Sequence, residues 1–229
     1  MTPAEVMTPA ELLASDVVAN ATMNRGRGLS GVNSYARELR CDIPTFLQQR
    51  VRERGEAVWY DACGGEGRAL REARRHLDAT DWGGKVRLLG VDLVGPPAPV
   101  VSPGLTLLSA DVVTYAPVEP VDLLTCVHGL HYLGDKLGFL QHAYGCLSPG
   151  GLLLGHLDTA NLRLPLPWSQ LARRVRAAGV TLRLKDHLLR VEREDAALDF
   201  GLAYQGATVS EQPNYTGITV IDSWYDVGR

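Results

Sequence analysis

Apolar residues recur at helical spacing in the first part of the chain, between about Pro3 and Arg54. They form one face around Leu12–Val18 and another around Tyr35–Val51, and a period of 3.6 residues indicates amphipathic helices. The two faces are joined by Asn24–Gly31, whose three glycines favour a flexible connection. We predict that residues 1–54 form a helical cover, or lid, over the rest of the protein.

From residue 55 onward, short apolar runs alternate with segments at helical spacing. Glycine and proline separate them: Ser148–Gly151 is a clear stop, and the proline-rich stretch Gly95–Pro103 is predicted to hold no regular structure. The alternation indicates an α/β fold with a doubly wound, mainly parallel sheet, which places ligands beyond the carboxyl ends of its strands. The predicted strands are Ala57–Tyr60, Val86–Val91, Leu105–Leu108, Val121–Cys126 and Leu152–Gly155.

The last third of the chain is less regular. A helix is predicted up to about Gly179, followed by a strand pair in Val180–Val191. Two short apolar runs, Leu202–Tyr204 and Ile218–Ile221, flank the turn-rich loop Pro213–Gly217 and predict a closing antiparallel pair. We therefore expect one core over residues 55–229, with an excursion on the substrate side at about 162–210.

The chain has 229 residues, of which 45% are hydrophobic, so it can bury a full core and is expected to form one domain with an appendage. The net charge is -3 and no run of like charges occurs, which disfavours nucleic acid as a partner. Neither a signal-peptide pattern nor a membrane-spanning apolar run is found, so we expect a cytoplasmic protein with no membrane partner. The four cysteines lack CxxC spacing and are predicted to be reduced thiols. No pattern favours one oligomeric state over another.

A glycine-rich segment, Asp61-Ala62-Cys63-Gly64-Gly65-Glu66-Gly67, stands between the first predicted strand and a helical pattern. Such a turn presents free backbone N–H groups to an anionic ligand group, and glycines let the ligand approach the backbone closely. A dinucleotide fingerprint that begins at Gly65 would need glycine or alanine where Leu70 stands. The turn therefore predicts a ligand site and disfavours a nicotinamide-dependent oxidoreductase.

The turn, with Asp61 ahead of its glycines, resembles that of the class I S-adenosylmethionine-dependent methyltransferases. Further residues match this family in the expected order. The acidic residue that ends the family's second strand matches Asp92, the Asp after the third strand matches Asp111, and the Asp that opens the fourth matches Asp122. The segment Ser148–Gly151 is similar to the family's turn into its fifth strand.

The resemblance implies a Rossmann-like sheet of seven strands, S-adenosylmethionine as cofactor and S-adenosylhomocysteine as its product. Cys63 departs from the family pattern, which usually has its first glycine at that position. In related enzymes an N-terminal helix often reaches the methionine carboxylate of the cofactor, and Tyr35 is a candidate for that contact. The implied cofactor-binding residues are Asp61, Cys63, Gly65, Gly67, Asp92, Leu93, Asp111, Val112, Val127 and Tyr35.

Methyl transfer is a direct displacement, so the protein has to align the acceptor, exclude water and, for a hydroxyl or ammonium acceptor, remove a proton. The resemblance implies an acceptor over the ends of the fourth and fifth strands, and a neutral imidazole suits proton removal near pH 7. We predict His128, His131 and His156 as catalytic candidates, with simple packing as the alternative for each. No metal is expected, because Asp158 is the only carboxylate beside these histidines.

Candidate acceptor-binding residues come from the N-terminal connection and from two aromatic positions. Arg25 and Arg27 could clamp an acceptor carboxylate or phosphate, although solvated loop arginines are commoner. Tyr132 follows the histidines, and Tyr215 lies in the turn-rich loop before the last predicted strand. For both tyrosines the alternative is packing against their own element.

Two branches of the resembled family are disfavoured by single residues. An enzyme that methylates amino groups of DNA bases would carry Asn/Asp-Pro-Pro-aromatic after the fourth strand, where Asp122–Thr125 reads DLLT. A cytosine C5 enzyme would need a Pro-Cys pair, and no cysteine follows a proline. We therefore favour methyl transfer to an oxygen or nitrogen atom of a small-molecule acceptor. A peptide or protein acceptor, and a non-catalytic S-adenosylmethionine-binding protein, remain the alternatives.

Overall fold

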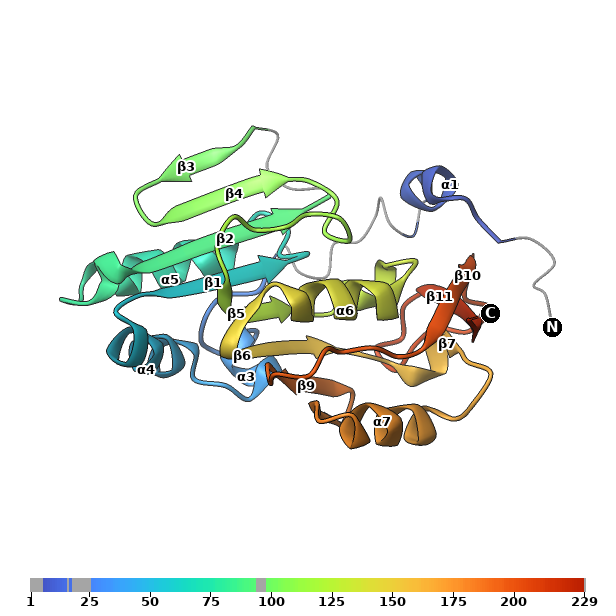
Figure 1. Cartoon of the computed structure of the whole chain (residues 1–229). Coiled ribbons are helices and arrows are strands. Elements are labelled where there is room, and N and C mark those ends of the chain that lie inside the picture. The colour runs from blue at the N-terminus through green and yellow to red at the C-terminus, as the bar shows by residue number, and fades with distance from the viewer. Residues whose placement is uncertain (1–5, 16, 18–25, 94–97, 229) are drawn as a thin grey trace.

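The computed structural model describes residues 6–15, 17, 26–93 and 98–228. Within this part of the chain, eight strands form one sheet in the order β3-β4-β2-β1-β5-β6-β9-β8 (Figure 1). β1, β2, β4, β5 and β6 run parallel, β9 is antiparallel to β6, and β8 is antiparallel to β9. The strands are β1 (Ala57–Ala62), β2 (Val86–Asp92), β3 (Val100–Ser102), β4 (Leu105–Ser109), β5 (Val121–Cys126), β6 (Leu147–His156), β8 (Thr181–Lys185) and β9 (Leu188–Glu192).

This sheet confirms the predicted doubly wound, mainly parallel fold. The chain adds β2 and β4 on one side of β1 and then β5 and β6 on the other, so the strand order reverses beside β1. Seven strands are expected from the sequence; the additional one, β3, lies inside Gly95–Pro103, which the sequence predicts to be irregular. That prediction is wrong, because Val100 and Val101 pair with β4 across a turn at Gly104 (φ 71°), and β-branched residues favour strands.

Helices cover both faces of the sheet. The adjacent residues Trp59 and Tyr60 of β1 are both buried and point to opposite faces, as successive residues of a strand do. Trp59 packs with residues of α3, α4 and α5, whereas Tyr60 packs with residues of α6 and α7. Two apolar layers explain why every residue of β1 and β5 is buried. The helices are α3 (Tyr35–Leu39), α4 (Ile43–Arg54), α5 (Arg68–Asp78), α6 (Lys136–Gly145) and α7 (Trp168–Ala177).

A buried carboxylate ties α4 to the amino-terminal edge of the sheet. Asp122, at the start of β5, lies 3.0 Å from Arg50 of α4 and accepts hydrogen bonds from the backbone N–H of Val58 (2.9 Å) and the Ser148 hydroxyl (2.8 Å). A buried charge is tolerated only when it is paired and hydrogen-bonded. Asp122 therefore has a structural role, and it lies at the edge of the sheet opposite to the carboxyl ends of the strands.

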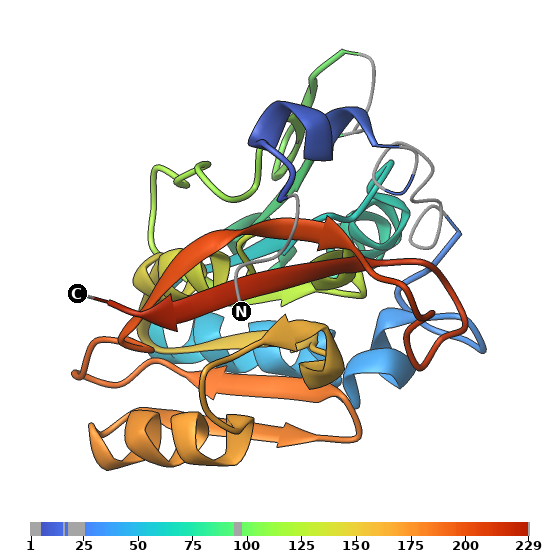
Figure 2. The ribbon, with the colours of Figure 1, turned by 90° about the vertical axis from the view of Figure 1, so that its right-hand side faces the viewer.

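A second sheet, of order β10-β11-β7, lies on the side of the molecule to which the arrowheads of β2 and β4 point (Figure 1). Figure 2 shows β10 and β11 running across this side. The first described helix, α1, packs on this sheet through Leu12, which contacts Ala207 and Ile221. Just before the helix, the Met7 N–H donates a hydrogen bond to the Ala207 carbonyl (2.8 Å). The elements are α1 (Pro9–Ala14), β7 (Leu162–Arg163), β10 (Leu202–Val209) and β11 (Ile221–Val227), with three short 3-10 helices, η1 (Gly83–Lys85), η2 (Gly129–Tyr132) and η3 (Thr159–Asn161), elsewhere.

The last third of the chain contributes to both sheets. The strand pair predicted in Val180–Val191 is present as β8 and β9 and completes the main sheet. The predicted closing pair is also present, but it forms the second sheet, and β11 begins at Ile221, where the sequence predicts a strand from Ile218. Among the described helices, none combines the length and apolar character needed to cross a membrane.

Candidate functional site

The glycine turn, residues 63–67, leads from β1 into α5. Cys63, Gly65 and Gly67 have positive φ values of 61°, 60° and 71°, a region that L side chains rarely adopt. A Cβ atom on Gly67 would lie 2.7 Å from the Leu107 side chain, so glycine is also required by close packing. No side chain caps the amino end of α5 in the described part of the chain. Its first N–H groups are therefore available to an anionic ligand group.

Cys63 is accommodated in this turn despite its departure from the family pattern. A non-glycine residue in the left-handed region costs roughly 1–2 kcal/mol. The side chain packs tightly on Gly129 of η2, where a Cβ atom would lie 2.8 Å from the Cys63 Sγ atom. A hydrogen bond with Cys126 and burial raise the pKa of the Cys63 thiol well above its ordinary value. The neutral thiol thus acts as a small packing group between the turn and the chain after β5.

Asp61 lies fully buried beneath the turn. The Tyr35 hydroxyl donates a hydrogen bond to its Oδ2 atom (2.8 Å) and the Thr125 hydroxyl donates to its Oδ1 atom (2.6 Å). Burial raises the pKa of the Asp61 carboxyl to about 7, although the two hydroxyl donors oppose this rise. A Cβ atom on Gly64 would collide with the carboxylate. Tyr35, which the sequence assigns to the cofactor, points to Asp61 here and connects α3 to β1.

The remaining residues predicted to bind the cofactor lie at the carboxyl ends of β2, β4 and β5. The register of the parallel strands brings these ends to one edge of the sheet. Asp92 ends β2, and its Oδ2 atom accepts a hydrogen bond from the backbone N–H of Gly65 (2.7 Å), so the acidic residue and the turn are in direct contact. Of the others, Leu93 and Asp111 are exposed, whereas Val112 and Val127 are buried.

Four segments far apart in the sequence meet next to the turn and form the histidine cluster, which comprises Glu38, His128, His131, His156 and Tyr215. The Glu38 Oε2 atom lies 3.3 Å from His128 Nε2 and 3.6 Å from His156 Nε2. The His128 and His156 rings stack in parallel, with centroids 4.2 Å apart and 2° between their planes. His128 Nδ1 lies 3.4 Å from His131 Nε2 and 3.5 Å from the Tyr215 hydroxyl.

The backbone directs two of these histidines to the same place. His156 ends β6, and His128 follows the neighbouring strand β5 in a left-handed conformation with a φ of 58°. Non-glycine residues adopt this conformation at a cost, and such strained positions concentrate at functional sites. The structure thus brings together the three histidines predicted as catalytic candidates, at the ends of the two strands where the sequence places the acceptor.

Burial governs the charge of the cluster. It lowers the pKa of His128 below its ordinary value, that of His131 to about 2 and that of His156 to about 3. It also raises the pKa of the Tyr215 hydroxyl. All three imidazoles are therefore neutral near pH 7, and each keeps a nitrogen lone pair that can accept a proton or bind a metal.

A cavity of about 380 Å³ borders the cluster, and we call it the acceptor cavity. Glu38, His128, His156 and Tyr215 line it. His131 is not among the lining residues and is fully buried behind His128, so its contact to the cavity runs through His128 Nδ1.

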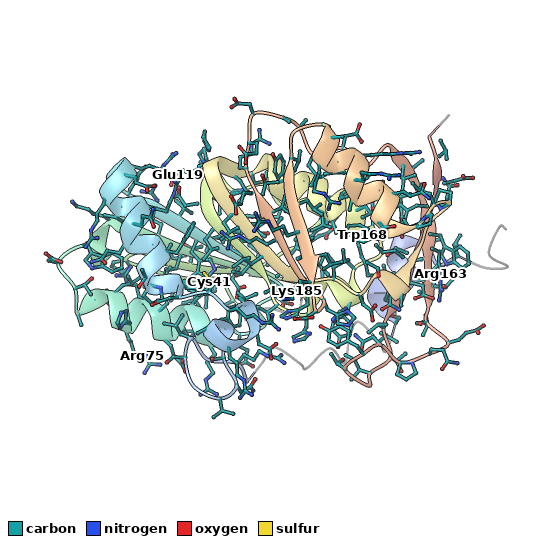
Figure 3. All side chains as sticks on the ribbon, turned by 90° about the horizontal axis from the view of Figure 1, so that it is seen from below. Cys41, Arg75, Glu119, Arg163, Trp168 and Lys185 are labelled. Atoms are coloured by element: carbon teal, nitrogen blue, oxygen red, sulfur yellow. The ribbon has the colours of Figure 1, made fainter. Side chains whose placement is uncertain are left out.

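The rim of the cavity joins the N-terminal helices to the β8–β9 hairpin. Arg40 and Asp186 line the cavity and form an ion pair with Nη1 and Oδ2 3.0 Å apart. Their neighbours in the sequence, Cys41 and Lys185, are labelled in Figure 3, which shows the molecule from below. Arg37, Glu38 and Arg40 therefore form one wall of the cavity, and Asp186 and Leu188 lie on the hairpin side.

The predicted acceptor-binding residues occupy different surroundings. Arg25 lies outside the described residues. The Arg27 side chain is largely buried, and its Nε atom lies 3.3 Å from Glu38 Oε1, next to the cluster. Tyr132 is half-buried and packs on the apolar group of Leu12 and Ile221. Tyr215 lies in the cluster and lines the cavity, and Arg27 contacts the lining residue Glu38.

Three residues of the site are absent from the sequence-based prediction. Glu38 reaches the histidines, Thr125 holds Asp61, and His187 stacks on Tyr215 with ring centroids 3.8 Å apart. Glu38 lies one helical turn from Tyr35, which is a signal that the same helix face meets the strand ends. Nothing in the sequence near His187 distinguishes it from an ordinary turn residue.

The reversed strand order, the glycine turn after β1 and the acidic residues that end β1 and β2 define a class I methyltransferase fold. The profile of a methyltransferase domain family matches residues 33–195, and the chain belongs to this family. Its members use S-adenosylmethionine as methyl donor, so the family and the cofactor implied by the resemblance are confirmed. A comparison with curated proteins gave no match.

Solved structures of similar fold share little sequence with this chain. An O-methyltransferase family protein from Burkholderia thailandensis is 14% identical with a TM-score of 0.41, covering 68% of this chain and 55% of that one. The CurJ carbon methyltransferase is 10% identical with a TM-score of 0.40, covering 61% and 49%. The N-methyltransferase NodS from Bradyrhizobium japonicum WM9 is 13% identical with a TM-score of 0.40, covering 66% and 94%. The chain thus spans about half the length of the first two proteins.

Proposed function

We propose that the protein transfers a methyl group from S-adenosylmethionine to an oxygen or nitrogen atom of a small molecule held in the acceptor cavity. The observation that carries this proposal is a cavity of about 380 Å³ that is lined by two neutral histidines, His128 and His156, which follow β5 and end β6. Small-molecule sites commonly measure about 300–1,000 Å³, so the space suits a small acceptor.

The residues around the glycine turn fit the cofactor. The amino end of α5, directly after the turn, offers N–H groups that no side chain caps within the described residues. Asp92 and Asp111 are the residues to which the family resemblance assigns the ribose hydroxyls and the adenine amino group. When bound, S-adenosylmethionine supplies an electrophilic methyl group on a positively charged sulfur atom.

The residues of the histidine cluster orient the acceptor and take up its proton, the two tasks that the chain itself must perform. His128 is our candidate for the general base, because it is neutral and lines the cavity. The Glu38 carboxylate, 3.3 Å from His128 Nε2, would hold the ring and stabilise the imidazolium that forms. His131, which contacts His128 Nδ1, is a positioning residue.

The test has two stages. Calorimetry of the purified protein should show binding of S-adenosylmethionine and S-adenosylhomocysteine and no binding of NAD. Incubation with S-adenosylmethionine that carries a labelled methyl group, together with fractionated metabolites of the source organism, should then transfer the label to a small molecule. Binding of NAD without either sulfur nucleoside would overturn the proposal, and label found only on peptides or proteins would overturn the acceptor class.

A further inference from the structure

We infer that Glu38, His128 and His156 form a binding site for a divalent transition-metal ion such as Zn²⁺, beside the acceptor cavity. Each residue offers one ligand atom, and these atoms all lie within 4.8 Å of one another. Among the described residues, this is the one group of three or more His, Cys, Asp and Glu side chains with ligand atoms so close. Two imidazoles and one carboxylate suit zinc or iron, whereas Mg²⁺ and Ca²⁺ prefer oxygen ligands.

The carboxylate of Glu38 removes the reason for which the sequence predicts no metal. The sequence disfavours a metal because Asp158 is the only carboxylate near the histidines along the chain. Folding places α3 against the strand ends and brings Glu38 to His128, which lies 90 positions away. The reason for excluding a metal therefore does not hold for the folded chain.

The distances within the group agree with metal coordination. Zinc binds nitrogen and oxygen ligands at about 2.0–2.2 Å, so two ligand atoms at a tetrahedral angle lie about 3.4 Å apart. The Glu38 Oε2 atom lies 3.3 Å from His128 Nε2 and 3.6 Å from His156 Nε2. The oxygen atom of Glu38 is thus at the separation from both nitrogen atoms that a shared ion requires.

Residues around the three ligands fix their orientation, as outer residues of metal sites do. Arg27 pairs with the Oε1 atom of Glu38 at 3.3 Å, which directs Oε2 to the histidines. His128 Nδ1 faces His131 Nε2 and the Tyr215 hydroxyl at 3.4 and 3.5 Å.

Metal binding requires one change in ring orientation. The His128 and His156 rings are parallel within 2°, and nitrogen lone pairs that lie in two parallel planes do not meet at one ion. No hydrogen bond within the described residues holds the Nδ1 atom of His156, and the residue borders the cavity, so the ring has space on one side for this change. A turn of the His156 ring would direct its Nε2 atom to the ion.

A site with three protein ligands leaves coordination positions open, which is typical of catalytic metal sites. The open positions would face the acceptor cavity, where a bound oxygen or nitrogen atom of the acceptor would lose its proton more readily. With the ion bound, His128 is a ligand and the ion takes over its role in removing the acceptor proton. This role of the ion rests on the proposed function, whereas binding of the ion itself does not.

The experiment measures metal binding without cofactor or acceptor. The full-length protein, freed of metal with a chelator, is titrated with Zn²⁺ by calorimetry and with Co²⁺, whose visible absorption reports its coordination. We expect one ion per chain. Glu38→Gln and His156→Ala should each weaken binding on the order of 100-fold, since even loss of an outer residue weakens metal sites by about 10–100-fold. His76→Ala removes an exposed histidine at the far end of α5 and should leave the affinity unchanged.

Two outcomes would overturn the metal site: failure of the wild-type protein to bind either ion, or an unchanged affinity in Glu38→Gln. Glu38 is the decisive position, because its side chain is 29% exposed and glutamine has nearly the same shape, so we expect Glu38→Gln to fold. Binding of S-adenosylhomocysteine is measured on the same samples. Retained nucleoside binding without metal binding refutes the site alone, whereas the reverse result refutes the proposed function alone.

Discussion

The glycine turn and the histidine cluster lie at the same edge of the main sheet, but the chain builds them in different ways. The turn is one continuous stretch that joins β1 to α5, and its geometry follows from local glycines. The cluster is assembled from α3, the ends of β5 and β6, and the loop before β11. The turn therefore depends on local conformation, and the cluster depends on how distant elements pack.

Burial also shifts the pKa values of the two regions in opposite directions. It raises the pKa of the Asp61 carboxyl under the turn to about 7, and it lowers the pKa of His156 in the cluster to about 3. In both cases burial favours the neutral form. Removal of water from both regions therefore sets the protonation state of the site before any ligand binds. Variants in the turn and in the histidine cluster can separate the roles of the two regions.

The largest effect is expected from His128→Ala in the histidine cluster. If His128 takes up the acceptor proton, its loss should lower kcat about 10²–10⁴-fold, the usual contribution of a general base. Affinity for S-adenosylhomocysteine should hardly change, because Asp61 and Asp92 remain. Steady-state kinetics with the acceptor found in the labelling screen, with His76→Ala as control, measures this. A variant with wild-type kcat would remove His128 from the chemistry.

A second prediction concerns the pH dependence of stability at the turn. The carboxyl of Asp61 has a pKa of about 7 in the folded chain and an ordinary value of 3.8. A raised folded pKa means that its stabilisation is fully present below pH 4 and is lost as the pH rises through 7. At about 1.36 kcal/mol per unit, this loss amounts to several kcal/mol. Denaturant unfolding of wild type and Asp61→Asn should show curves that diverge between pH 4 and 7; parallel curves would contradict it.

The same contrast explains how far the sequence could predict the site. Asp61 and Asp92 lie at the carboxyl ends of β1 and β2, and the glycines follow β1, so apolar runs and turn composition are enough to predict where these residues stand in the fold. Glu38 and Tyr215 are positioned by tertiary packing: the spacing of Glu38 from Tyr35 indicates a shared helix face, but no local pattern predicts that either residue contacts His128. The same holds for the fold. Apolar runs predict the parallel strands, whereas the sequence does not predict β3, because its valines stand among prolines.

A third prediction tests the turn by cofactor affinity. Asp92→Ala should raise the Kd for S-adenosylhomocysteine on the order of 10-fold or more, since a hydrogen bond to a carboxylate contributes about 1.5–3 kcal/mol. Asp92→Asn keeps an oxygen that can accept from the Gly65 N–H, and its effect should be smaller. Calorimetry of both variants beside His128→Ala makes the comparison direct. An equal loss in His128→Ala would show that the two regions do not divide binding from chemistry.

The smallest effect is expected at the rim, where Arg40 and Asp186 connect α3 to the β8–β9 hairpin. Both side chains are more than half exposed, at 60% and 56%, and exposed ion pairs contribute about 0.2–1 kcal/mol. Both residues have left-handed backbones, so Arg40→Gln and Asp186→Asn remove the charges without adding a β-branched side chain. A double-mutant cycle from denaturant unfolding should give a coupling energy within that range, reduced by salt. A much larger coupling would mean that this pair holds α3 over the strand ends, and the histidine cluster would then depend on its rim.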